Sequence, residues 1–371
     1  MKILLIGNYE LGDAKSMPRF GEMLRRELTA RGHHVELLRA RALVGSLATG
    51  TLGKWLGYLD MYLLFPLRLW LRSGRRWDAV HICDHSNAVY RPWVRGRRPS
   101  ITCHDLLAIH AAEGRFPRQH ISRTGRLQQQ WIKRNLLAIE RVVCVSRTTA
   151  RELEALGARG EIRVISNPLN RSFQPASAQQ LTAIRRSLGL QDDEPYLLQV
   201  GGNLWYKNRP GIVRIFAALR SQHPVFASFK LVMAGHPFND DLRAELNRLA
   251  LQPHVIEVFD PPDDVVEALY TGASLLLFAS LYEGFGWPIL EAQTLGCPVA
   301  TSNREPMSEV AGGAAILVDP ENPEAAAAAI AAAWPQCARL REAGLRNVAR
   351  FSSEQLIAEY ETFFREGVAR A

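Results

Sequence analysis

The chain has 371 residues, of which 47% are hydrophobic and 22% are charged, and it carries a formal net charge of +8. This composition is typical of an ordinary soluble globular protein and excludes collagen-like and disordered chains. The length predicts two domains.

In the first half of the chain, short apolar runs alternate with amphipathic stretches. Helical periodicity is clear over residues 19–31 and 148–156. We expect strands at residues 3–6, 34–38, 79–82, 100–104, 141–145 and 162–165. Strands that are apolar throughout and alternate with helices predict a parallel sheet that is covered by helices on both faces.

The same pattern restarts after Asn167-Pro168, and the polar segment over residues 170–178 is typical of a linker. We expect further strands at residues 196–200, 229–234, 255–259, 274–278, 298–301 and 315–317. Helices are expected at residues 209–222, 240–249, 263–270, 288–295, 323–333 and 352–365.

These elements predict an α/β protein with two doubly wound, Rossmann-like domains that face each other across a cleft. The N-terminal domain is expected over residues 1–170, joined by the C-terminal helix of residues 352–371. The C-terminal domain is expected over residues 171–351. Ligands of doubly wound sheets bind beyond the carboxyl ends of the strands, so we expect the site in the cleft.

A glycine-rich turn flanked by two glutamates follows the expected strand at residues 274–278. It reads EGFGWPILE from Glu283 to Glu291, and its proline suits the first turn of a helix. Backbone N–H groups beside a helix N-terminus bind anions, so we expect Gly284, Phe285 and Gly286 to hold a diphosphate. Each glutamate is able to accept hydrogen bonds from the vicinal hydroxyls of a sugar.

This turn and the residues after it resemble the signature of glycosyltransferase family 4, whose members have the GT-B fold. The resemblance covers nearly the whole chain and is strongest in the second half. It is carried by residues 283–292, 296, 298–299, 302–303 and 309–312, and in the first half by residues 31–35, 102–105, 145–146 and 165–168. It implies a retaining transferase in which Glu283 contacts the donor sugar and Glu291 the nucleotide ribose.

A second glycine turn contains a lysine and follows the expected strand at residues 196–200. It reads VGGNLWYKN from Val200 to Asn208. Lys207 is expected to neutralise the charge that grows on the leaving diphosphate as the glycosidic bond breaks. Family members usually have an arginine a few residues before this lysine, whereas Gly202 or Asn203 stands there in this chain. We expect both residues to contact the donor, with the Asn203 amide as a neutral donor of a hydrogen bond.

His104 ends an expected strand and resembles the family's histidine at the corresponding strand end. We expect it to support the reacting centre, with Asp105 orienting the imidazole; the alternative is a ring whose hydrogen bonds are made by the backbone. His85 is a second candidate, on the acceptor side. Gly12 is the best match to the family's glycine-rich loop beside the donor phosphate, and the G-x-G-x-x-G spacing of a dinucleotide site is absent.

No cofactor and no metal are expected, because the resemblance implies basic residues and helix dipoles in place of a metal at the phosphates. The paired aspartates at residues 192–193, 240–241 and 263–264 are interpreted as helix caps. Five scattered cysteines have neither a metal-type spacing nor the even number of a disulfide framework. They predict reduced thiols and a cytoplasmic location.

Positive charge is concentrated in the first half of the chain. Residues 1–172 carry 29 Lys and Arg against 14 Asp and Glu, whereas the remaining residues carry 16 against 23. This imbalance predicts an anionic partner, such as a phospholipid surface or a pyrophosphate-linked acceptor. No nucleic-acid-binding motif is recognised, so nucleic acid is not expected as a partner.

The apolar stretch over residues 55–76 is interrupted by charged residues and by Pro66, so it is a poor candidate for a membrane span. It contains Arg68, Arg72, Arg75 and Arg76, and further arginines follow at positions 91, 95, 97 and 98. Two interpretations stay open. The stretch either lies in a membrane interface or is a core helix on the first sheet with an exposed basic end.

The sequence therefore predicts a retaining glycosyltransferase that moves a sugar from a nucleoside diphosphate sugar to an acceptor hydroxyl. His104, Lys207 and Glu283 are the expected catalytic residues, and a lipid-linked glycan or polysaccharide precursor is the candidate acceptor, bound by the N-terminal domain. The alternatives are a non-catalytic scaffold of the same fold that binds a sugar nucleotide, and a nucleotide-sugar epimerase.

Overall fold

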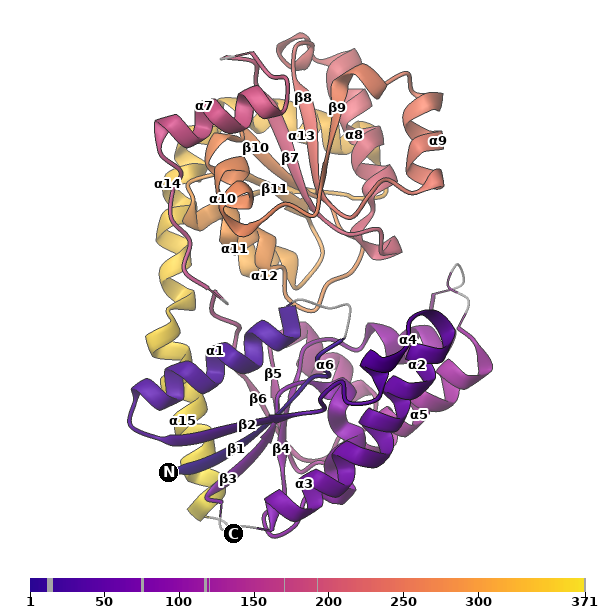
Figure 1. Ribbon diagram of the computed structural model, residues 1–371. Helices are drawn as coiled ribbons and strands as arrows, with labels where there is room; N and C mark the ends of the chain where they lie inside the picture. Colours follow the sequence, from indigo (N-terminus) through magenta and orange to yellow (C-terminus); the bar gives the residue numbers. More distant parts are fainter. Residues whose placement is uncertain are drawn as a thin grey trace. The chain divides into compact units, whose positions relative to one another are not determined.

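The computed structural model describes residues 1–11, 16–74, 77–116, 119, 121–169, 171–191 and 193–369. The chain divides into two compact units (Figure 1). Unit 1 comprises Met1–Arg171 and Ser352–Ala371, and unit 2 comprises Ser172–Phe351. Four residues singled out in the sequence, Gly12, Arg75, Arg76 and Asp192, lie outside the described residues.

Unit 1 contains a six-stranded parallel sheet in the order β2-β1-β3-β4-β5-β6. The strands are β1 Lys2–Gly7, β2 His34–Arg39, β3 Ala79–Ile82, β4 Ser100–Cys103, β5 Arg141–Cys144 and β6 Glu161–Val164. The order of the strands reverses between β1 and β3. In doubly wound sheets such a reversal opens a crevice beyond the carboxyl ends of the two strands.

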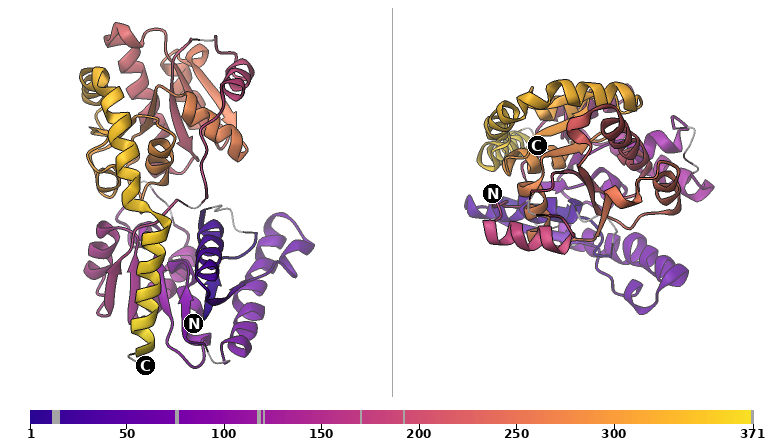
Figure 2. Two further views of the ribbon diagram at one scale, coloured as in Figure 1. Left: turned by 90° about the vertical axis from the view of Figure 1, so that its left-hand side faces the viewer. Right: turned by 90° about the horizontal axis from the view of Figure 1, so that it is seen from above.

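Helices cover both faces of this sheet. They are α1 Ser16–Ala30, α2 Gly50–Leu59, α3 Phe65–Ser73, α4 Leu107–Ala112, α5 Arg123–Leu137, α6 Arg147–Ala155 and α15 Ser353–Ala369. The α3 and α5 helices pack on the face that carries Leu4 and Ile6. The C-terminal helix α15 runs along the sheet of unit 1 (Figure 2), where the Tyr360 hydroxyl and Thr102 Oγ1 lie 3.0 Å apart.

Unit 2 contains a second six-stranded parallel sheet, in the order β12-β11-β10-β7-β8-β9. The strands are β7 Tyr196–Gly201, β8 Lys230–Gly235, β9 Val255–Phe259, β10 Leu275–Phe278, β11 Val299–Ser302 and β12 Ile316–Val318. Counted from β7, this is the 3-2-1-4-5-6 order of the Rossmann fold, and the reversal falls between β7 and β10.

The helices of unit 2 are α7 Ala178–Ser187, α8 Arg209–Gln222, α9 Asp240–Arg248, α10 Asp263–Gly272, α11 Trp287–Thr294, α12 Met307–Ala311, α13 Pro323–Ala333 and α14 Cys337–Val348. The α8, α9 and α13 helices bury their apolar faces against one side of the sheet in a single hydrophobic core. The interpretation of the aspartate pairs at 240–241 and 263–264 as helix caps is wrong, because the cap residues are Asn239 for α9 and Pro262 for α10. The aspartates lie in the first turns, where their charge suits the helix dipole.

The predicted strands are all present, with ends that differ by at most one residue, and the prediction of two doubly wound α/β sheets is confirmed. Buried strands leave an unambiguous apolar run in the sequence, which explains this agreement. The helices α7, α12 and α14 were not among those predicted for the second half. No helix in the described part of the chain is long and apolar enough to cross a membrane.

Candidate functional site

The two glycine turns singled out in the sequence follow neighbouring strands of unit 2. The lysine turn follows β7, which ends at Gly201, and the glutamate turn follows β10, which ends at Phe278. These strands pair directly and flank the reversal of strand order. The topology therefore brings both motifs to the point where ligands bind in sheets of this type.

Lys207 and Glu283 form an ion pair between these turns. Lys207 Nζ donates to Glu283 Oε1 over 2.7 Å, and the two side chains are only 18% and 10% exposed. Lys207 ends a short 3-10 turn, Trp205–Lys207, that is bonded to the other loop, because Leu281 N donates to Tyr206 O over 2.7 Å. The ammonium group therefore has a fixed position, and its partner is the carboxylate predicted to hold the sugar.

Asn208 connects the same two loops and was not predicted to have a role. Its backbone is left-handed, with φ of 53°, a conformation that asparagine tolerates better than most residues. Its Nδ2 donates to Ala279 O over 2.9 Å and to Pro320 O over 3.0 Å. The only signal in the sequence was an asparagine between the lysine and the next helix.

The glutamate turn ends in a left-handed glycine before α11. Gly286 has φ of 112°, and an added Cβ would lie 3.2 Å from Ile289 Cδ1, so the turn requires glycine. The Phe285 ring is buried against Trp287 and Phe351, which leaves only its backbone for a ligand. Glu291 Oε2 accepts a hydrogen bond of 2.9 Å from the hydroxyl of the fully buried Tyr270.

Arg209 is a cation at the lysine turn that the sequence reasoning missed. Its Nη1 donates to Asn203 Oδ1, and to His236 O over 3.0 Å, while Asn203 Nδ2 donates to Pro237 O over 2.5 Å. The side chain is 2% exposed, and burial lowers the pKa of the guanidinium to about 10. The structure thus places a buried positive charge beside Asn203, one of the two residues that stand where family members usually have an arginine.

Gly202 completes the lysine turn. An added Cβ would lie 3.4 Å from the His236 ring, so the turn lies beside the loop after β8. The structure therefore brings together Gly202, Asn203, Lys207 and Glu283 through hydrogen bonds and close packing between adjacent loops of unit 2. Glu291 is fixed separately, one turn into α11.

In unit 1, His104 lies directly after β4 and is 5% exposed. Its Nε2 lies 2.9 Å from Cys83 O, and Phe20 meets the imidazole edge-on at a centroid distance of 4.6 Å. Burial lowers the pKa of His104 and so favours the neutral ring. The Asp105 carboxylate accepts from Leu107 N over 3.0 Å. The contact expected under the alternative interpretation, from the ring to the backbone, is therefore present, and the Asp105 carboxylate bonds the backbone at the start of α4.

Polar side chains also meet at the strand reversal of unit 1. Asn8 Nδ2 donates to Asp84 Oδ2 over 2.6 Å, and His85 Nδ1 lies 3.3 Å from Asp84 Oδ1. Although burial acts to raise the pKa of Asp84, the neighbouring imidazoles of His85 and His104 hold it below its ordinary value. These residues follow β1, β3 and β4, and they form a charged and polar edge at the expected acceptor side.

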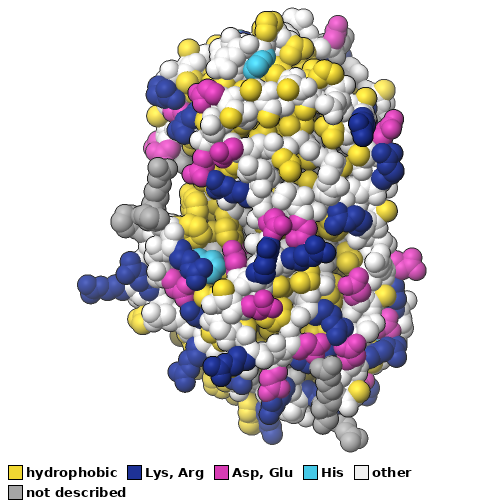
Figure 3. Space-filling view, turned by 180° about the vertical axis from the view of Figure 1, so that it is seen from behind, with side chains coloured by type: hydrophobic (Ala, Val, Ile, Leu, Met, Phe, Trp, Pro, Cys, Tyr) yellow, Lys and Arg dark blue, Asp and Glu magenta, His cyan; other side chains and the backbone are white. Residues whose placement is uncertain are grey.

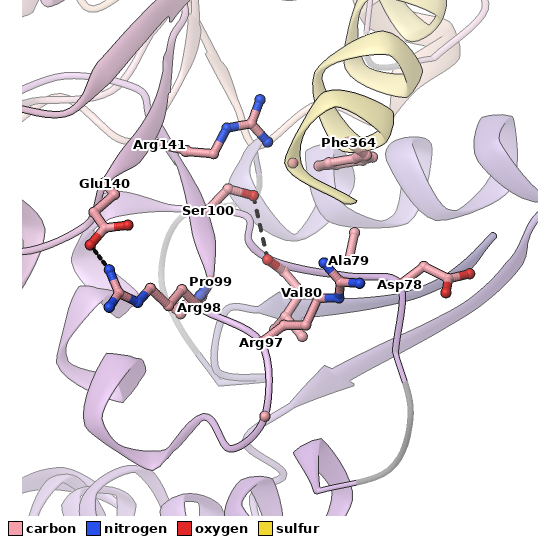
Figure 4. Close-up of a pocket in the computed structure, with 12 residues that line it drawn as sticks. Asp78, Ala79, Val80, Arg97, Arg98, Pro99, Ser100, Glu140, Arg141 and Phe364 are labelled. Carbon is pink, nitrogen blue, oxygen red and sulfur yellow. Dashed lines mark hydrogen bonds and ion pairs between the residues drawn. The ribbon is translucent and has the colours of Figure 1, made fainter. Parts of the chain in front are cut away.

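A cavity of about 690 Å³ lies at the opposite edge of the unit 1 sheet, where β3, β4 and β5 begin (Figure 4). It is lined by Asp78, Ser100, Arg141 and Phe364 among others, and none of the predicted site residues lines it. We place the site by topology and by the motif contacts, because ligands of parallel sheets bind at the carboxyl ends of the strands. Within the described residues, no group of three or more His, Cys, Asp or Glu is arranged to hold a metal ion.

Comparisons with known proteins agree with this arrangement. The model of "Glycosyl transferases group 1" matches residues 181–344, and that of "Glycosyltransferase Family 4" matches residues 19–173. The chain is 31% identical to O-antigen chain mannosyltransferase B of Escherichia coli over 166 residues, which are 43% of this chain and 42% of that protein.

A second curated relative matches a larger share of the chain. The chain is 26% identical over 266 residues to the GDP-mannose:cellobiosyl-diphosphopolyprenol alpha-mannosyltransferase of Komagataeibacter xylinus, covering 68% of this chain and 64% of that protein. The chain thus spans less than two thirds of both of these curated relatives.

The structure superposes on sucrose-phosphate synthase from Thermosynechococcus elongatus with a TM-score of 0.76 and 18% identity, over 100% of both chains. This likeness concerns the fold. The two family models together match most of both units, and the motif residues lie where the strand order reverses. The chain therefore belongs to glycosyltransferase family 4, the group 1 glycosyltransferases of GT-B fold.

Proposed function

We propose that the protein transfers a hexose from a nucleoside diphosphate sugar to an acceptor hydroxyl, with retention of the anomeric configuration. The observation that carries this proposal is the Lys207–Glu283 ion pair of 2.7 Å, which joins the two motif loops at the strand reversal of unit 2. In this pair the Lys207 ammonium, which we assign to the diphosphate, lies directly beside the Glu283 carboxylate, which we assign to the sugar hydroxyls.

The other donor contacts follow from the same loops. The backbone of Gly284, Phe285 and Gly286 meets the diphosphate at the N-terminus of α11, where helix N–H groups bind anions. Glu291 accepts hydrogen bonds from the ribose hydroxyls, with its carboxylate oriented by Tyr270. Gly202 and Asn203 border the phosphates on the other side, and Arg209 supplies positive charge behind Asn203.

The reaction needs no protein nucleophile. The bond from the anomeric carbon to the phosphate oxygen breaks, and a bond to the acceptor oxygen forms on the same face of the sugar. The acceptor proton passes to the departing phosphate oxygen. Lys207 stabilises the negative charge that develops on the diphosphate. Stabilising such a charge in the transition state is usually the largest contribution that a fixed group makes to catalysis. His104 in unit 1 supports the reacting centre as a neutral imidazole.

For the donor and the acceptor we propose GDP-mannose and a polyprenol-diphosphate-linked glycan. This choice is supported by the names of two relatives, both mannosyltransferases, one of which names this donor and a diphosphopolyprenol acceptor. The surplus of Lys and Arg in residues 1–172 suits an acceptor that carries a diphosphate.

The donor is tested by the thermal stability of the wild-type protein with GDP-, UDP- and ADP-sugars and the free diphosphates. We expect the correct donor to raise the melting temperature, since a ligand at one hundred times its Kd adds about 2.7 kcal/mol. Glu291→Ala should lose this shift. The matched control is Glu342→Gln, an exposed glutamate on α14, which should keep it.

Turnover separates the proposed transferase from its alternatives. The proposal expects the sugar of the correct donor to appear on the acceptor, with its anomeric configuration retained when the product is followed by NMR. Donor binding without turnover would identify a scaffold, and conversion of the donor to its epimer without acceptor would identify an epimerase. A protein that none of the sugar nucleotides stabilises would contradict the donor site itself.

A further inference from the structure

The helical segment after the second strand of unit 1 exposes a continuous row of large apolar side chains. The helix α2 continues without a break through a π-helical turn, Asp60–Leu64, into α3, so that the segment runs from Gly50 to Ser73. We call the exposed side chains the apolar row: Leu52, Trp55, Leu59, Leu63, Leu67 and Leu71. Trp55, Leu63 and Leu71 are 62%, 63% and 62% exposed, so the row is open to solvent along its whole length.

The spacing of the row explains the π turn. Its members are three or four residues apart, and steps of four exceed the 3.6 residues of an α-helical turn. A row spaced by fours would therefore drift around an ideal helix. The wider turn at residues 60–64 compensates for this drift and keeps the row on one side.

The opposite side of the segment is fixed to unit 1. Phe65 and Leu69 are buried in the core, and Phe65 meets Tyr90 at a ring distance of 4.8 Å. Asp60 is 1% exposed and accepts from Gly45 N over 2.8 Å and from Val44 N over 3.1 Å. One face of the segment thus belongs to the core, as the second interpretation of the sequence expected, and the other face is exposed.

A neighbouring helix, α5, adds one further aromatic residue and an exposed leucine to this surface. The Trp131 ring of α5 lies 5.4 Å from the Tyr62 ring, and Gln128 Nε2 donates to the Tyr62 hydroxyl over 2.6 Å. Leu127, one turn before Trp131, is 66% exposed. Tryptophan and tyrosine at the margin of an apolar surface are typical of proteins that lie at a membrane–water interface.

The charges around the apolar row are positive. Between residues 41 and 77 the chain has a single acidic residue, the buried Asp60, whereas Arg41, Lys54, Arg68 and Arg72 lie in the same stretch. Burial, and then the charges of Arg41 and Arg72, lower the pKa of Arg68, while the charges of Glu36 and Glu10 act in the opposite direction. Glu36, on β2, forms an ion pair with Arg72 over 3.7 Å.

Further basic groups adjoin the segment. The Arg95 guanidinium lies 4.2 Å from the centre of the Trp70 ring, and Trp70 is itself 40% exposed. On the face shown in Figure 3, Lys and Arg side chains lie among Asp and Glu side chains over unit 1. The apolar row is therefore bordered by cations and by no exposed carboxylate of its own segment.

We propose that this surface of unit 1 docks on an anionic lipid bilayer, with the apolar row lying parallel to the membrane in its interfacial region. A row of leucine and tryptophan beside arginine and lysine gains from apolar burial and from attraction to anionic headgroups. The segment binds on the membrane and does not cross it, in line with the absence of a spanning helix among the described residues.

A second copy of the chain fits this surface less well than an anionic bilayer does. In a symmetric dimer each patch meets its own equivalent. The arginines around one row would then face those of the other, with no exposed carboxylate from residues 41–77 to pair with them. Anionic lipid supplies the complementary charge. The proposal concerns unit 1 alone and stands independently of the donor assigned to unit 2.

The test is flotation of the purified full chain with vesicles of phosphatidylcholine, with and without phosphatidylglycerol, at low and high salt. We expect partition into the anionic vesicles only, weakened by salt. Leu63→Ser with Leu67→Ser should lower this partition at least about tenfold, because each leucine loses its apolar burial. Leu345→Ser, at a leucine of α14 that is 51% exposed, is the matched control and should leave it unchanged.

A second readout keeps the test decisive if the double variant folds poorly. Lipids brominated on the acyl chain quench tryptophans that enter the interface, and Trp55→Phe should remove a large part of this quenching. The proposal is overturned if the wild type fails to float with anionic vesicles at low salt, or if the folded double variant floats as well as the wild type. A dimer that the double variant dissociates, measured by light scattering, would instead assign the surface to a second copy.

Discussion

At the scale of single residues, the ion pair between Lys207 and Glu283 shows how one ammonium group serves two ligands. An ammonium has three donors, and one of them is used by Glu283 Oε1. The others are able to meet phosphate oxygens when the donor binds. The pair has another consequence: when the site is empty, each charge stabilises the other in a half-buried place where an isolated charge would be costly.

Replacing Lys207 with methionine, which has a similar length and no charge, should lower kcat by about 10²–10³-fold. The reason is that one fixed group stabilising a developing charge contributes about 2.7–4 kcal/mol. The measurement is the rate of sugar transfer at saturating donor. Lys230→Met is the control, because Lys230 starts β8 at the opposite edge of the same sheet and bonds Pro253 O. Equal losses in both variants would argue against the proposed role.

A different residue, His81, should make unit 1 sensitive to acid. Its imidazole is fully buried between Ser100 Oγ and Thr102 Oγ1, each at 2.8 Å. Burial, and then the charges of His104 and Arg141, lower its pKa to about 3 from an ordinary 6.5. The folded state therefore holds the neutral ring, while the unfolded chain takes up a proton below pH 6.5.

It follows that the contribution of His81 to stability is complete above pH 6.5 and falls as the pH drops toward 3. At pH 5 the loss should be about 2 kcal/mol. Urea unfolding of the wild type and of His81→Gln at several pH values measures it, and the variant should show a smaller decline below pH 6.5. Exposed His34→Gln should keep the slope of the wild type, and an unchanged slope in His81→Gln would refute the assignment.

At the scale of elements, the C-terminal helix α15 belongs to the core of unit 1. It buries Leu356, Ile357, Tyr360, Phe363 and Phe364, and its charged residues bond to the same unit, as in the Arg163–Glu366 ion pair of 2.5 Å. The last helix of the chain thus packs on the sheet that residues of the first half form. The apolar spacing of the last segment predicted the helix. Only the structure shows which side chains of the sheet it contacts, among them Thr102 and His81.

Phe364→Ala should therefore destabilise unit 1 by about 3–5 kcal/mol, the usual cost of removing a buried aromatic ring. The ring is 1% exposed and lies 5.2 Å from His81. Hydrogen exchange should accelerate in β3 and β4, while β7 and β10 of unit 2 keep their protection. Phe259→Ala, at a phenylalanine that is 66% exposed, is the control. A loss below about 1 kcal/mol would show that α15 is dispensable to this core.

At the scale of the whole molecule, the two sheets have different strand orders, and each has one point of reversal. The loops after β7 and β10 flank one reversal, and Asn8 and Asp84 follow the strands of the other. This placement explains why residues some 76 positions apart, Lys207 and Glu283, form one ion pair. It also explains why the cavity at the amino edge of unit 1 lies away from the motif residues.

The sequence by itself determined the strands, the two doubly wound sheets and the motif loops, because buried parallel strands and glycine turns leave local patterns of apolar and small residues. It did not disclose Arg209, Asn208 or Tyr270 as partners of the motif residues, since those contacts join segments distant in sequence or depend on a side-chain direction. It also left the segment after residue 50 undecided between core and surface. Only tertiary packing decided this point, because a helix with apolar residues on two sides does not reveal which side the sheet will cover.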